Sequence, residues 1–294
     1  MTMDIRPLTP GFAAAVSGID LTRPLSQAEA AALETGMDQY AVLIYHGQII
    51  TDEQQKAFSL NFGPLETTAG GNVTHAKDQR LGAFMADVSN LDTNHQPLAR
   101  DDRRRMFNLG NQLWHSDSSF RAIPAKYSIL SGRVTVDQGG QTQFADMRAA
   151  YDALDTAAQA EIEDLVCEHS LLYSRGTLGF TALSEAEKAM FTPVRQRLVR
   201  VHPVTGRKSL FLSSHIGTIL GWPVPEARAF LRDLTEHAVQ SRFIYKHVWK
   251  QYDMLMWDNR STMHRVTRFD ETKVRDMRRT TVAGGGMTAE QRAA

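Results

Sequence analysis

Hydrophobic residues recur at helical spacing in four stretches of the chain, and each stretch opens with a residue type that favours helix starts. Ser26 has Glu29 three positions on, which is a capping-box pattern, and Thr51 opens a second one. The other two stretches begin with Asp146 and Pro225. The predicted amphipathic helices span residues 26–40, 51–63, 146–166 and 225–240.

Short runs rich in β-branched and aromatic residues lie between these helices, bounded by Gly, Asp, Asn or Pro. The predicted strands are AVLIYHG (41–47), MFNLGN (106–111), KYSILSGRVTV (126–136), KSLFLSS (208–214), FIYKHVWK (243–250), DMLMWDN (253–259) and RRTTVAG (278–284). Helices and strands do not alternate regularly and no glycine-rich phosphate loop follows a strand, which argues against a doubly wound sheet. We therefore predict a mainly β fold, an antiparallel sandwich or jelly roll with helices packed outside.

Length and charge narrow the classes of protein. The 294 residues contain no repeat, low-complexity block or linker, so we expect a single domain over 1–294. The 33 basic residues balance 33 acidic ones, which leaves no cationic field for nucleic acid or a membrane surface. No apolar run has the length of a membrane span, and the N-terminus lacks the pattern of a signal peptide. With the single cysteine, Cys167, this favours a reducing, cytoplasmic setting.

One polar stretch, NQLWHSDSSF (111–120), carries candidate chemistry. His115 is the only one of the ten histidines that is followed two positions later by an acid, Asp117. If the stretch is extended, both side chains share one face with Asn111, because side chains alternate along a strand. Taken alone, such a pair is equally typical of solvated surface residues, so a third partner decides its meaning.

His264 is the best candidate for that partner, because it closely follows the apolar strand DMLMWDN. Two imidazoles and one carboxylate suit ferrous iron and leave three coordination positions open. A structural zinc site would instead close its shell, usually with thiolates, which this chain lacks. His169, His202 and His215 flank polar turns and have no defined role.

Several arginines follow His264, and two of them are candidates for binding an anion. In the strand VRDMRRTTVAG, alternation places Arg275 and Arg279 on one face and Arg278 on the other. Arginine binds carboxylates well because its planar guanidinium donates paired hydrogen bonds and stays charged when buried. The alternative is a basic surface near the C-terminus, but apolar neighbours favour a pocket.

The spacing of five residues resembles the motif of the Fe(II)/2-oxoglutarate-dependent dioxygenases, in the branch of taurine dioxygenase and 2,4-dichlorophenoxyacetate dioxygenase. These five are His115, Asp117, Thr142, His264 and Arg275. The resemblance covers nearly the whole chain, from VSGIDLTRPL to MWDNRSTMHR. The fold it implies is a double-stranded β-helix, which agrees with the predicted sandwich.

The resemblance also implies roles for single residues. The implied iron ligands, and hence catalytic residues, are His115, Asp117 and His264. The implied 2-oxoglutarate-binding residues are Thr142, Arg275 and Asn111. Arg279 would hold the acidic group of the substrate. Ser89 and Asn90 are candidates for lining the substrate pocket that come from residues 66–105, a segment that we do not match to the family residue by residue. Further candidates for lining the substrate pocket are Val88, Tyr173, Ser174 and Arg175.

The flanks FADMRAAYDALD, HSLLYSRG and HPVTGR are more similar to the aryloxyalkanoate-cleaving relatives than to taurine dioxygenase. We therefore expect oxidative cleavage of an aryloxyalkanoate ether, with O2 and 2-oxoglutarate consumed and a phenol, a short oxoacid such as glyoxylate, succinate and CO2 released. The alternatives are a dioxygenase of an alkylsulfonate, alkyl sulfate or other small acid, and a non-catalytic jelly-roll binding protein. The paired glycines and polar content of residues 66–105 suggest an active-site lid. The resemblance implies a homo-oligomer.

Overall fold

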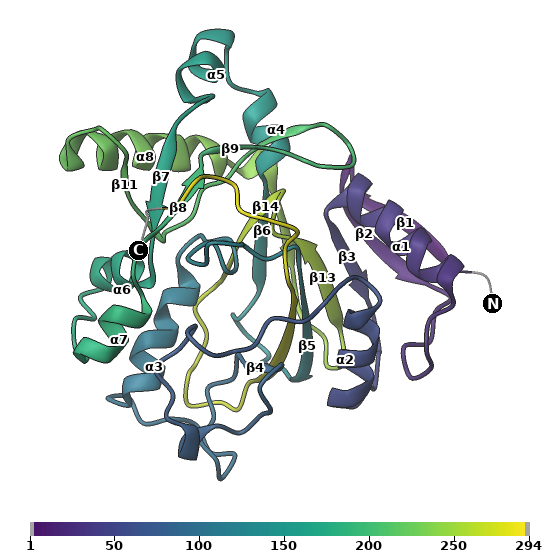
Figure 1. Cartoon of the computed structure of the whole chain (residues 1–294). Coiled ribbons are helices and arrows are strands. Elements are labelled where there is room, and N and C mark those ends of the chain that lie inside the picture. Colours follow the sequence, from purple (N-terminus) through teal and green to yellow (C-terminus); the bar gives the residue numbers. More distant parts are fainter. Residues whose placement is uncertain (1–2, 292–294) are drawn as a thin grey trace.

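A seven-stranded sheet forms the centre of the protein in the computed structural model, which describes residues 3–291 (Figure 1). In spatial order its strands are β1 (Asp4–Thr9), β2 (Phe12–Ser17), β3 (Val42–Tyr45), β13 (Met254–Asp258), β5 (Tyr127–Val134), β15 (Asp276–Val282) and β4 (Ala86–Asp87). All neighbours pair antiparallel except β2 and β3, which are parallel. The order joins strands from both ends of the chain.

A smaller antiparallel sheet packs against the large one. Its strands are β12 (Ile244–His247), β6 (Thr142–Asp146) and β14 (Thr262–Val266). Phe144 of β6 lies in one buried cluster with Leu130, Leu255 and Trp257 of the large sheet, and the ring centroids of Phe144 and Trp257 are 5.4 Å apart. Two sheets that share a core in this way form a sandwich, as the sequence predicted.

Helices cover the other face of the large sheet and one end of the sandwich. α1 (Gln27–Tyr40) and α2 (Asp52–Leu60) begin with the predicted capping boxes at Ser26 and Thr51, each worth about 1 kcal/mol. Met37 and Phe58 pack from these helices onto Tyr45 of β3. Figure 1 shows α8 (Val224–Ala238) and α4 (Met147–Asp152) at the end of the sandwich that β6 and β14 reach.

Two further small sheets extend this end. One has the order β11 (Ile216–Ile219), β7 (Val166–His169), β8 (Val194–Arg197), and the other pairs β10 (Lys208–Leu210) with β9 (Val199–Val201). Their apolar residues form a core with α4 and α8. The remaining helices are α3 (Arg103–Asn108), α5 (Thr156–Ile162), α6 (Leu171–Thr177) and α7 (Glu185–Met190), with short 3-10 turns at Ala76–Asp78, Leu109–Gln112 and Ser241–Phe243.

Two predicted elements are wrong. Residues 146–166 contain two helices rather than one. The first ends at Asp152, and Asp155 caps the second by accepting a hydrogen bond from the N–H of Ala158. Residues 106–111, predicted as a strand, belong to α3 and the following 3-10 turn, because Asp102 caps a helix there. Phe107 then packs against Phe180 and Phe191 instead of joining a sheet.

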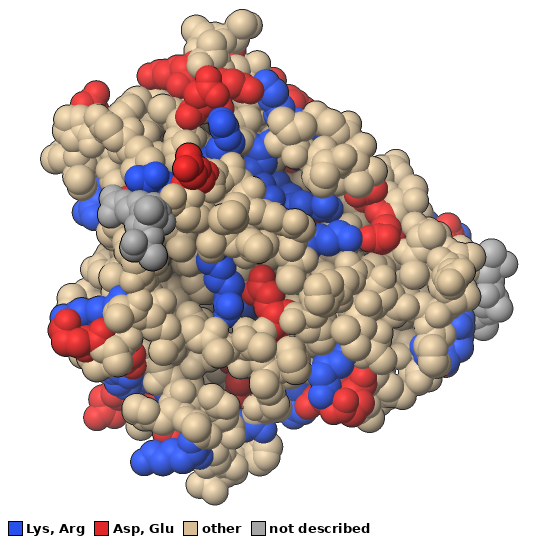
Figure 2. Space-filling model, in the orientation of Figure 1, with Lys and Arg blue, Asp and Glu red and all other residues tan. Residues whose placement is uncertain are grey.

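The fold class is nevertheless the predicted one, mainly β with packed helices. None of the helices within residues 3–291 is both long and apolar enough to cross a membrane. On the face shown in Figure 2, basic and acidic side chains occur in small, mixed groups. This distribution agrees with the balanced charge of the sequence and shows no broad basic surface on that face.

Candidate active site

His115 and His264 are brought together by a single antiparallel bridge between two distant segments. The N–H of each residue donates to the carbonyl of the other, at 3.0 Å from His115 and 2.8 Å from His264. His264 lies in β14, but residues 111–117 do not form a continuous extended strand, the conformation under which alternation would place His115 and Asp117 on one face. The bridge holds only His115, and the chain then turns, with Ser118 in the left-handed region at φ 54°.

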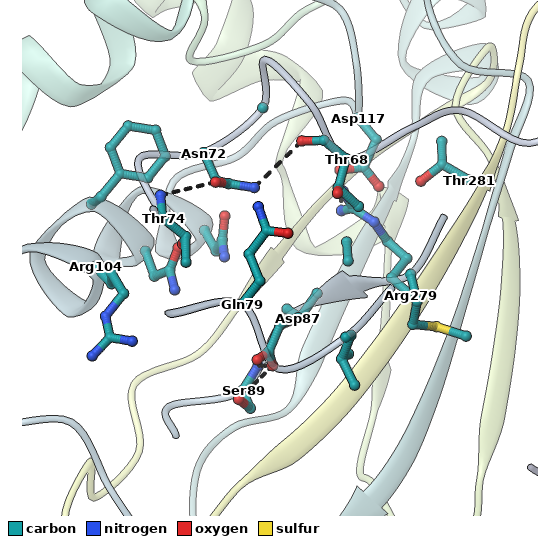
Figure 3. A pocket seen from close by; sticks show the side chains of 18 of the residues that line it. Thr68, Asn72, Thr74, Gln79, Asp87, Ser89, Arg104, Asp117, Arg279 and Thr281 are labelled. Carbon is teal, nitrogen blue, oxygen red and sulfur yellow. Dashed lines mark hydrogen bonds and ion pairs between the residues drawn. The ribbon is translucent and has the colours of Figure 1, made fainter. Parts of the chain in front are cut away.

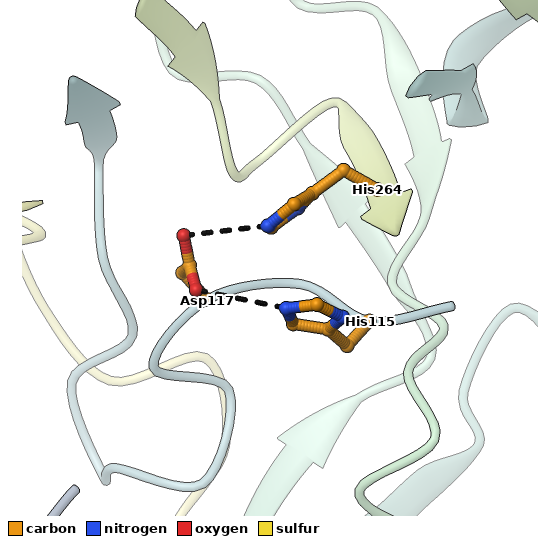
Figure 4. Close-up of side chains that lie close together, drawn as sticks. All are labelled: His115, Asp117 and His264. Carbon is orange, nitrogen blue, oxygen red and sulfur yellow. Dashed lines mark ion pairs between the residues drawn. The ribbon is translucent and has the colours of Figure 1, made fainter. Parts of the chain in front are cut away.

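The turn directs Asp117 back toward the two histidines, as Figure 4 shows. Nε2 of His264 lies 3.6 Å from Oδ2 of Asp117, and Nε2 of His115 lies 3.9 Å from Oδ1. One ligand atom from each of the three buried side chains lies within 4.8 Å of the others. This is the spacing that three ligands of one metal ion require. Among the residues that the structure describes, no other group of metal-ligating side chains meets the same criterion.

Hydrogen bonds from neighbouring groups fix the orientation of two of the three ligands, His115 and Asp117. Nδ1 of His115 donates to the carbonyl of Leu113 at 2.8 Å, which leaves Nε2 as the lone-pair donor. Oδ2 of Asp117 accepts a hydrogen bond from Ser128 at 2.7 Å, and Asn259 in turn donates to Ser128. Such second contacts orient metal ligands and keep the site in place.

The electrostatics favour the forms that bind a metal. Burial lowers the pKa of His115 and lowers that of His264 well below the ordinary value, so both rings are neutral near pH 7. Burial alone would raise the pKa of Asp117, but Arg279 and the two histidines outweigh it and lower the pKa to about 2. Two neutral imidazoles and an ionised carboxylate on one side of a site fit ferrous iron. The predicted ligand set is therefore compatible with iron.

A narrow, mostly apolar cavity leads from His115 and His264 to Arg275. Arg275 is buried, and its guanidinium donates long hydrogen bonds of 3.4 Å to the carbonyls of Val88 and Gly140 and lies 5.2 Å from the centroid of the Phe269 ring. Thr142 lies in the same cavity, and its hydroxyl accepts a hydrogen bond from Nε1 of Trp249 at 3.0 Å. Burial lowers the pKa of Arg275 to about 10, which still leaves it charged at neutral pH. A cation and a hydroxyl at the end of an apolar slot fit the distal carboxylate of 2-oxoglutarate.

A second, larger cavity opens on the other side of His115 and Asp117. Figure 3 shows Arg279 beside Asp117 at one end of it, with Arg104 far from both. The two cavities meet, because Val88, Ser89, Asn111, His115 and Arg279 line both. Asn111, which the resemblance implies as a 2-oxoglutarate-binding residue, lies where the two cavities meet.

Arg279 forms an ion pair with Oδ1 of Asp117, while its side chain remains 22% exposed. The predicted alternation holds along β15. Met277 lies in the core between the sheets and Arg279 lines the cavities. Arg278 points the other way and pairs with Asp52 of α2.

Comparisons with known proteins agree with this geometry. The profile of the family described as taurine catabolism dioxygenase TauD, TfdA family, matches residues 4–281. The chain belongs to this family. Membership confirms the predicted class of enzyme, an Fe(II)/2-oxoglutarate-dependent dioxygenase, and the predicted cofactors.

Three relatives illustrate how similar this family member is to characterised proteins. It is 45% identical over 283 residues to an alpha-ketoglutarate-dependent 2,4-dichlorophenoxyacetate dioxygenase of Cupriavidus pinatubonensis, with 96% of this chain and 98% of the relative covered. It is 37% identical to an (S)-phenoxypropionate/alpha-ketoglutarate-dioxygenase of Sphingobium herbicidovorans, with 96% and 95% covered. A crystal structure of AAD-2 in complex with Mn(II) and N-oxalylglycine superimposes with a TM-score of 0.96 at 61% identity, with 98% and 100% covered.

The candidate pocket residues Ser89 and Asn90 have specific contacts. Ser89 lines both cavities and donates its hydroxyl hydrogen to Asp87 at 2.5 Å. Asn90 lines only the narrow cavity, and its amide donates to the carbonyls of Glu271 and Lys273 while its oxygen accepts from the N–H of Arg275. Asn90 therefore positions Arg275 through a hydrogen bond to its backbone N–H.

The three histidines without a predicted role differ in their surroundings. His215 lines the larger cavity, 5.9 Å from the ring of His115. His202 pairs with Asp258 at 3.1 Å. His169 is buried against Phe211, and neither of its ring nitrogens has a hydrogen-bond partner among residues 3–291. Sequence reasoning missed Trp249 as the residue that orients Thr142, because the two are 107 positions apart and meet only through β12 and β6.

Proposed function

We propose that this protein cleaves the ether bond of an aryloxyalkanoate such as 2,4-dichlorophenoxyacetate. The observation that carries the proposal is the composition of the larger cavity, which combines Arg279 with aromatic side chains beside the metal ligands. Phe84, Phe107 and Phe120 offer apolar surface to an aryl ring, whereas a short aliphatic sulfonate has no group to use it. The names of the two relatives above support the same class of substrate.

The residues divide the work between the two cavities. Arg275 and Thr142 would anchor the distal carboxylate of 2-oxoglutarate and leave its keto acid end toward His115 and His264. Arg279 would hold the substrate's carboxylate next to Asp117, which places the carbon between carboxylate and ether oxygen close to the three ligands. Iron held by these ligands supplies the redox chemistry that couples oxidation of 2-oxoglutarate by O2 to oxidation of that C–H bond.

The products follow from the chemistry of the substrate. Hydroxylation of the carbon beside the ether oxygen gives a hemiacetal, which collapses to a phenol and a short oxoacid such as glyoxylate. 2-Oxoglutarate leaves as succinate and CO2. The burial of the ligands and the mostly apolar lining of the narrow cavity limit the access of bulk water to the reacting atoms.

We infer that residues 66–105 close over the substrate, since many of the residues lining the larger cavity come from this segment. Ser89, which lines both cavities, would then contact the substrate. The single, buried Cys167 supports a cytoplasmic location, and the family resemblance supports a homo-oligomer, which size-exclusion chromatography with light scattering would measure.

A turnover panel tests the proposed substrate class. Purified protein with Fe(II), ascorbate and 2-oxoglutarate is offered phenoxyacetate, 2,4-dichlorophenoxyacetate, both enantiomers of phenoxypropionate, taurine and an alkyl sulfate. We expect the highest kcat/KM with an aryloxyalkanoate, measured as phenol release. Preferential release of sulfite from taurine, or of sulfate from the alkyl sulfate, would overturn the proposal in favour of those substrates.

A further inference from the structure

Arg175, in α6, is a buried cation without a buried anion. Arg175 is only 5% exposed to solvent, and it lines the larger cavity. Within residues 3–291 it forms no ion pair, its Nε has no hydrogen-bond partner, and Nη1 donates only to the hydroxyl of Ser174 at 3.1 Å. A guanidinium carries five N–H donors, so most of its hydrogen-bonding capacity is left for something that enters the cavity.

The surrounding residues hold this guanidinium in a fixed place. Cζ of Arg175 lies 4.3 Å from the centroid of the Phe107 ring, in a cation–π contact. Gly110 lies against the same group, and a Cβ at that position would overlap the guanidinium. Ser174, which accepts the hydrogen bond from Nη1, is also 2.9 Å from Nδ1 of His215. The arginine is therefore oriented by its neighbours without being neutralised.

Burying a charge without a counter-charge is unfavourable, and burial lowers the pKa of Arg175 to about 10. The group is still protonated at neutral pH. Arg104, which lines the same cavity, differs because Asp102 accepts hydrogen bonds from its Nε and Nη2 at 3.1 and 2.8 Å. Of these two arginines of the cavity, only Arg175 has its charge available to a ligand.

Arg175 and Arg279 approach the metal ligands from different elements, α6 and β15. Both line the larger cavity together with His115. Arg279 already shares its charge with Asp117. A carboxylate placed beside His115 in the larger cavity would therefore meet a second, uncompensated guanidinium.

We propose that Arg175 is a second anchor for the substrate's carboxylate, so that the acidic group is held between Arg175 and Arg279. This inference rests on the proposed function for the identity of the acid. Two guanidiniums on different elements fix the carboxylate in direction as well as in position, and so fix the carbon that is oxidised. The substrate in turn supplies the anion that the buried arginine lacks.

Substrate binding without turnover tests this role. Protein loaded with Mn(II) and N-oxalylglycine is titrated calorimetrically with phenoxyacetate and with its neutral amide, phenoxyacetamide. For Arg175→Gln we expect the Kd of phenoxyacetate to rise about 10- to 100-fold, as for loss of a charge-assisted hydrogen bond. The Kd of the amide should change less than about threefold, and Arg175→Lys should recover part of the loss.

Two further variants serve as controls. Arg104→Gln removes an arginine that lines the same cavity but is already neutralised, and should leave the ratio of the two Kd values unchanged. Gly110→Ala keeps the charge of Arg175 but displaces the guanidinium, and should weaken phenoxyacetate selectively as Arg175→Gln does. If Arg175→Gln no longer binds Mn(II) and N-oxalylglycine, the result with Gly110→Ala tests the role of Arg175 instead.

An equal loss for acid and amide would show that Arg175 is only part of the cavity wall, and no loss for either would also overturn the proposal. A second pair, pentanoate and pentanamide, separates this inference from the proposed function. If the unsubstituted protein binds pentanoate but not phenoxyacetate, the aryl substrate class is wrong, and Arg175 is judged on the second pair. If it binds neither acid, both proposals fail.

Discussion

Asp117 links the metal ligands to the substrate cavity, because one carboxylate faces both histidines and Arg279. The sequence could identify Asp117 and His115 as a candidate pair, since the chemistry of a ligand is a property of its residue type. It could not show that His264 lies opposite them, because that depends on a bridge across 149 positions of chain between residues 115 and 264. His264 was a candidate beforehand because it follows the apolar strand DMLMWDN, and the resemblance to a family supported that choice.

Asp117→Asn should weaken metal binding by more than the roughly 10- to 100-fold that loss of an outer contact costs. The amide removes the only negative charge of the ligand set and leaves Arg279 without its partner. Titration with Fe(II) under argon measures the change. Ser128→Ala is a matched control that removes only the hydrogen bond to Oδ2, and it should fall within that smaller range.

The two arginines of the site should separate in their kinetic effects. Arg275→Gln should raise the KM for 2-oxoglutarate, and Arg279→Gln should mainly raise the KM for phenoxyacetate, because Arg275 lines only the narrow cavity whereas Arg279 also lines the larger one. Each lost charge-assisted contact should cost about 1.5–3 kcal/mol. Steady-state kinetics with each substrate varied in turn measures both constants. Identical profiles for the two variants would contradict this division of roles.

At the scale of elements, the sequence predicted best those features that depend on residues close together in the chain, such as helix caps and the alternation of side chains along a strand. The capping boxes placed α1 and α2, and alternation predicted which side chains of β15 face the site. Residues 106–111 and 146–166 were predicted wrongly, because short polar residues at positions 102 and 155 cap new helices within otherwise continuous patterns. Apolar periodicity reports which residues are buried, but capping decides where a helix starts.

Arg278→Gln tests the alternation of β15 directly. Its side chain pairs with Asp52 and Asp276 on the face away from the cavities, at 2.7 and 3.0 Å. Because these contacts are partly solvated, we expect the variant to lose roughly 1 kcal/mol or less of unfolding free energy. The KM values for 2-oxoglutarate and phenoxyacetate should stay unchanged. A selective rise in either KM would show that the strand presents its faces differently.

For the molecule as a whole, the order of the strands is the part that the sequence least determines. The large sheet places β3 beside β13 and β15 beside β4, and these pairings are set by packing between segments far apart in the chain. The mainly β class followed from composition and pattern, whereas the meeting of two cavities at His115 did not. The sequence likewise could not show that the buried guanidinium of Arg175 has no ion-pair partner within residues 3–291, because this depends on which distant residues surround it.

A buried ion pair outside the site should govern acid stability. Burial would raise the pKa of Asp258, but Arg260 and His202 lower it well below its usual range. A carboxylate with a depressed folded pKa stabilises the protein above its unfolded pKa of about 4, and this contribution is lost as the pH falls below that value. Asp258→Asn should therefore cost about 3–5 kcal/mol at pH 7 and clearly less at pH 3.

Urea denaturation of the metal-free protein at both pH values measures this difference. Asp233→Asn is a suitable control, because its carboxylate pairs with Arg232 on the surface, where both side chains are about two-thirds exposed. It should change the unfolding free energy little at either pH. A loss for Asp258→Asn that is equal at pH 7 and pH 3 would contradict the linkage to ionisation.

The most direct test of the whole account is the stoichiometry of one reaction. Protein with Fe(II), ascorbate, 2-oxoglutarate and O2 is given 2,4-dichlorophenoxyacetate, and 2,4-dichlorophenol, glyoxylate and succinate are quantified together over time. The account predicts that the three products form in a ratio near one to one to one, and that none forms with Asp117→Asn. Succinate without dichlorophenol, or dichlorophenol formed without 2-oxoglutarate, would contradict it.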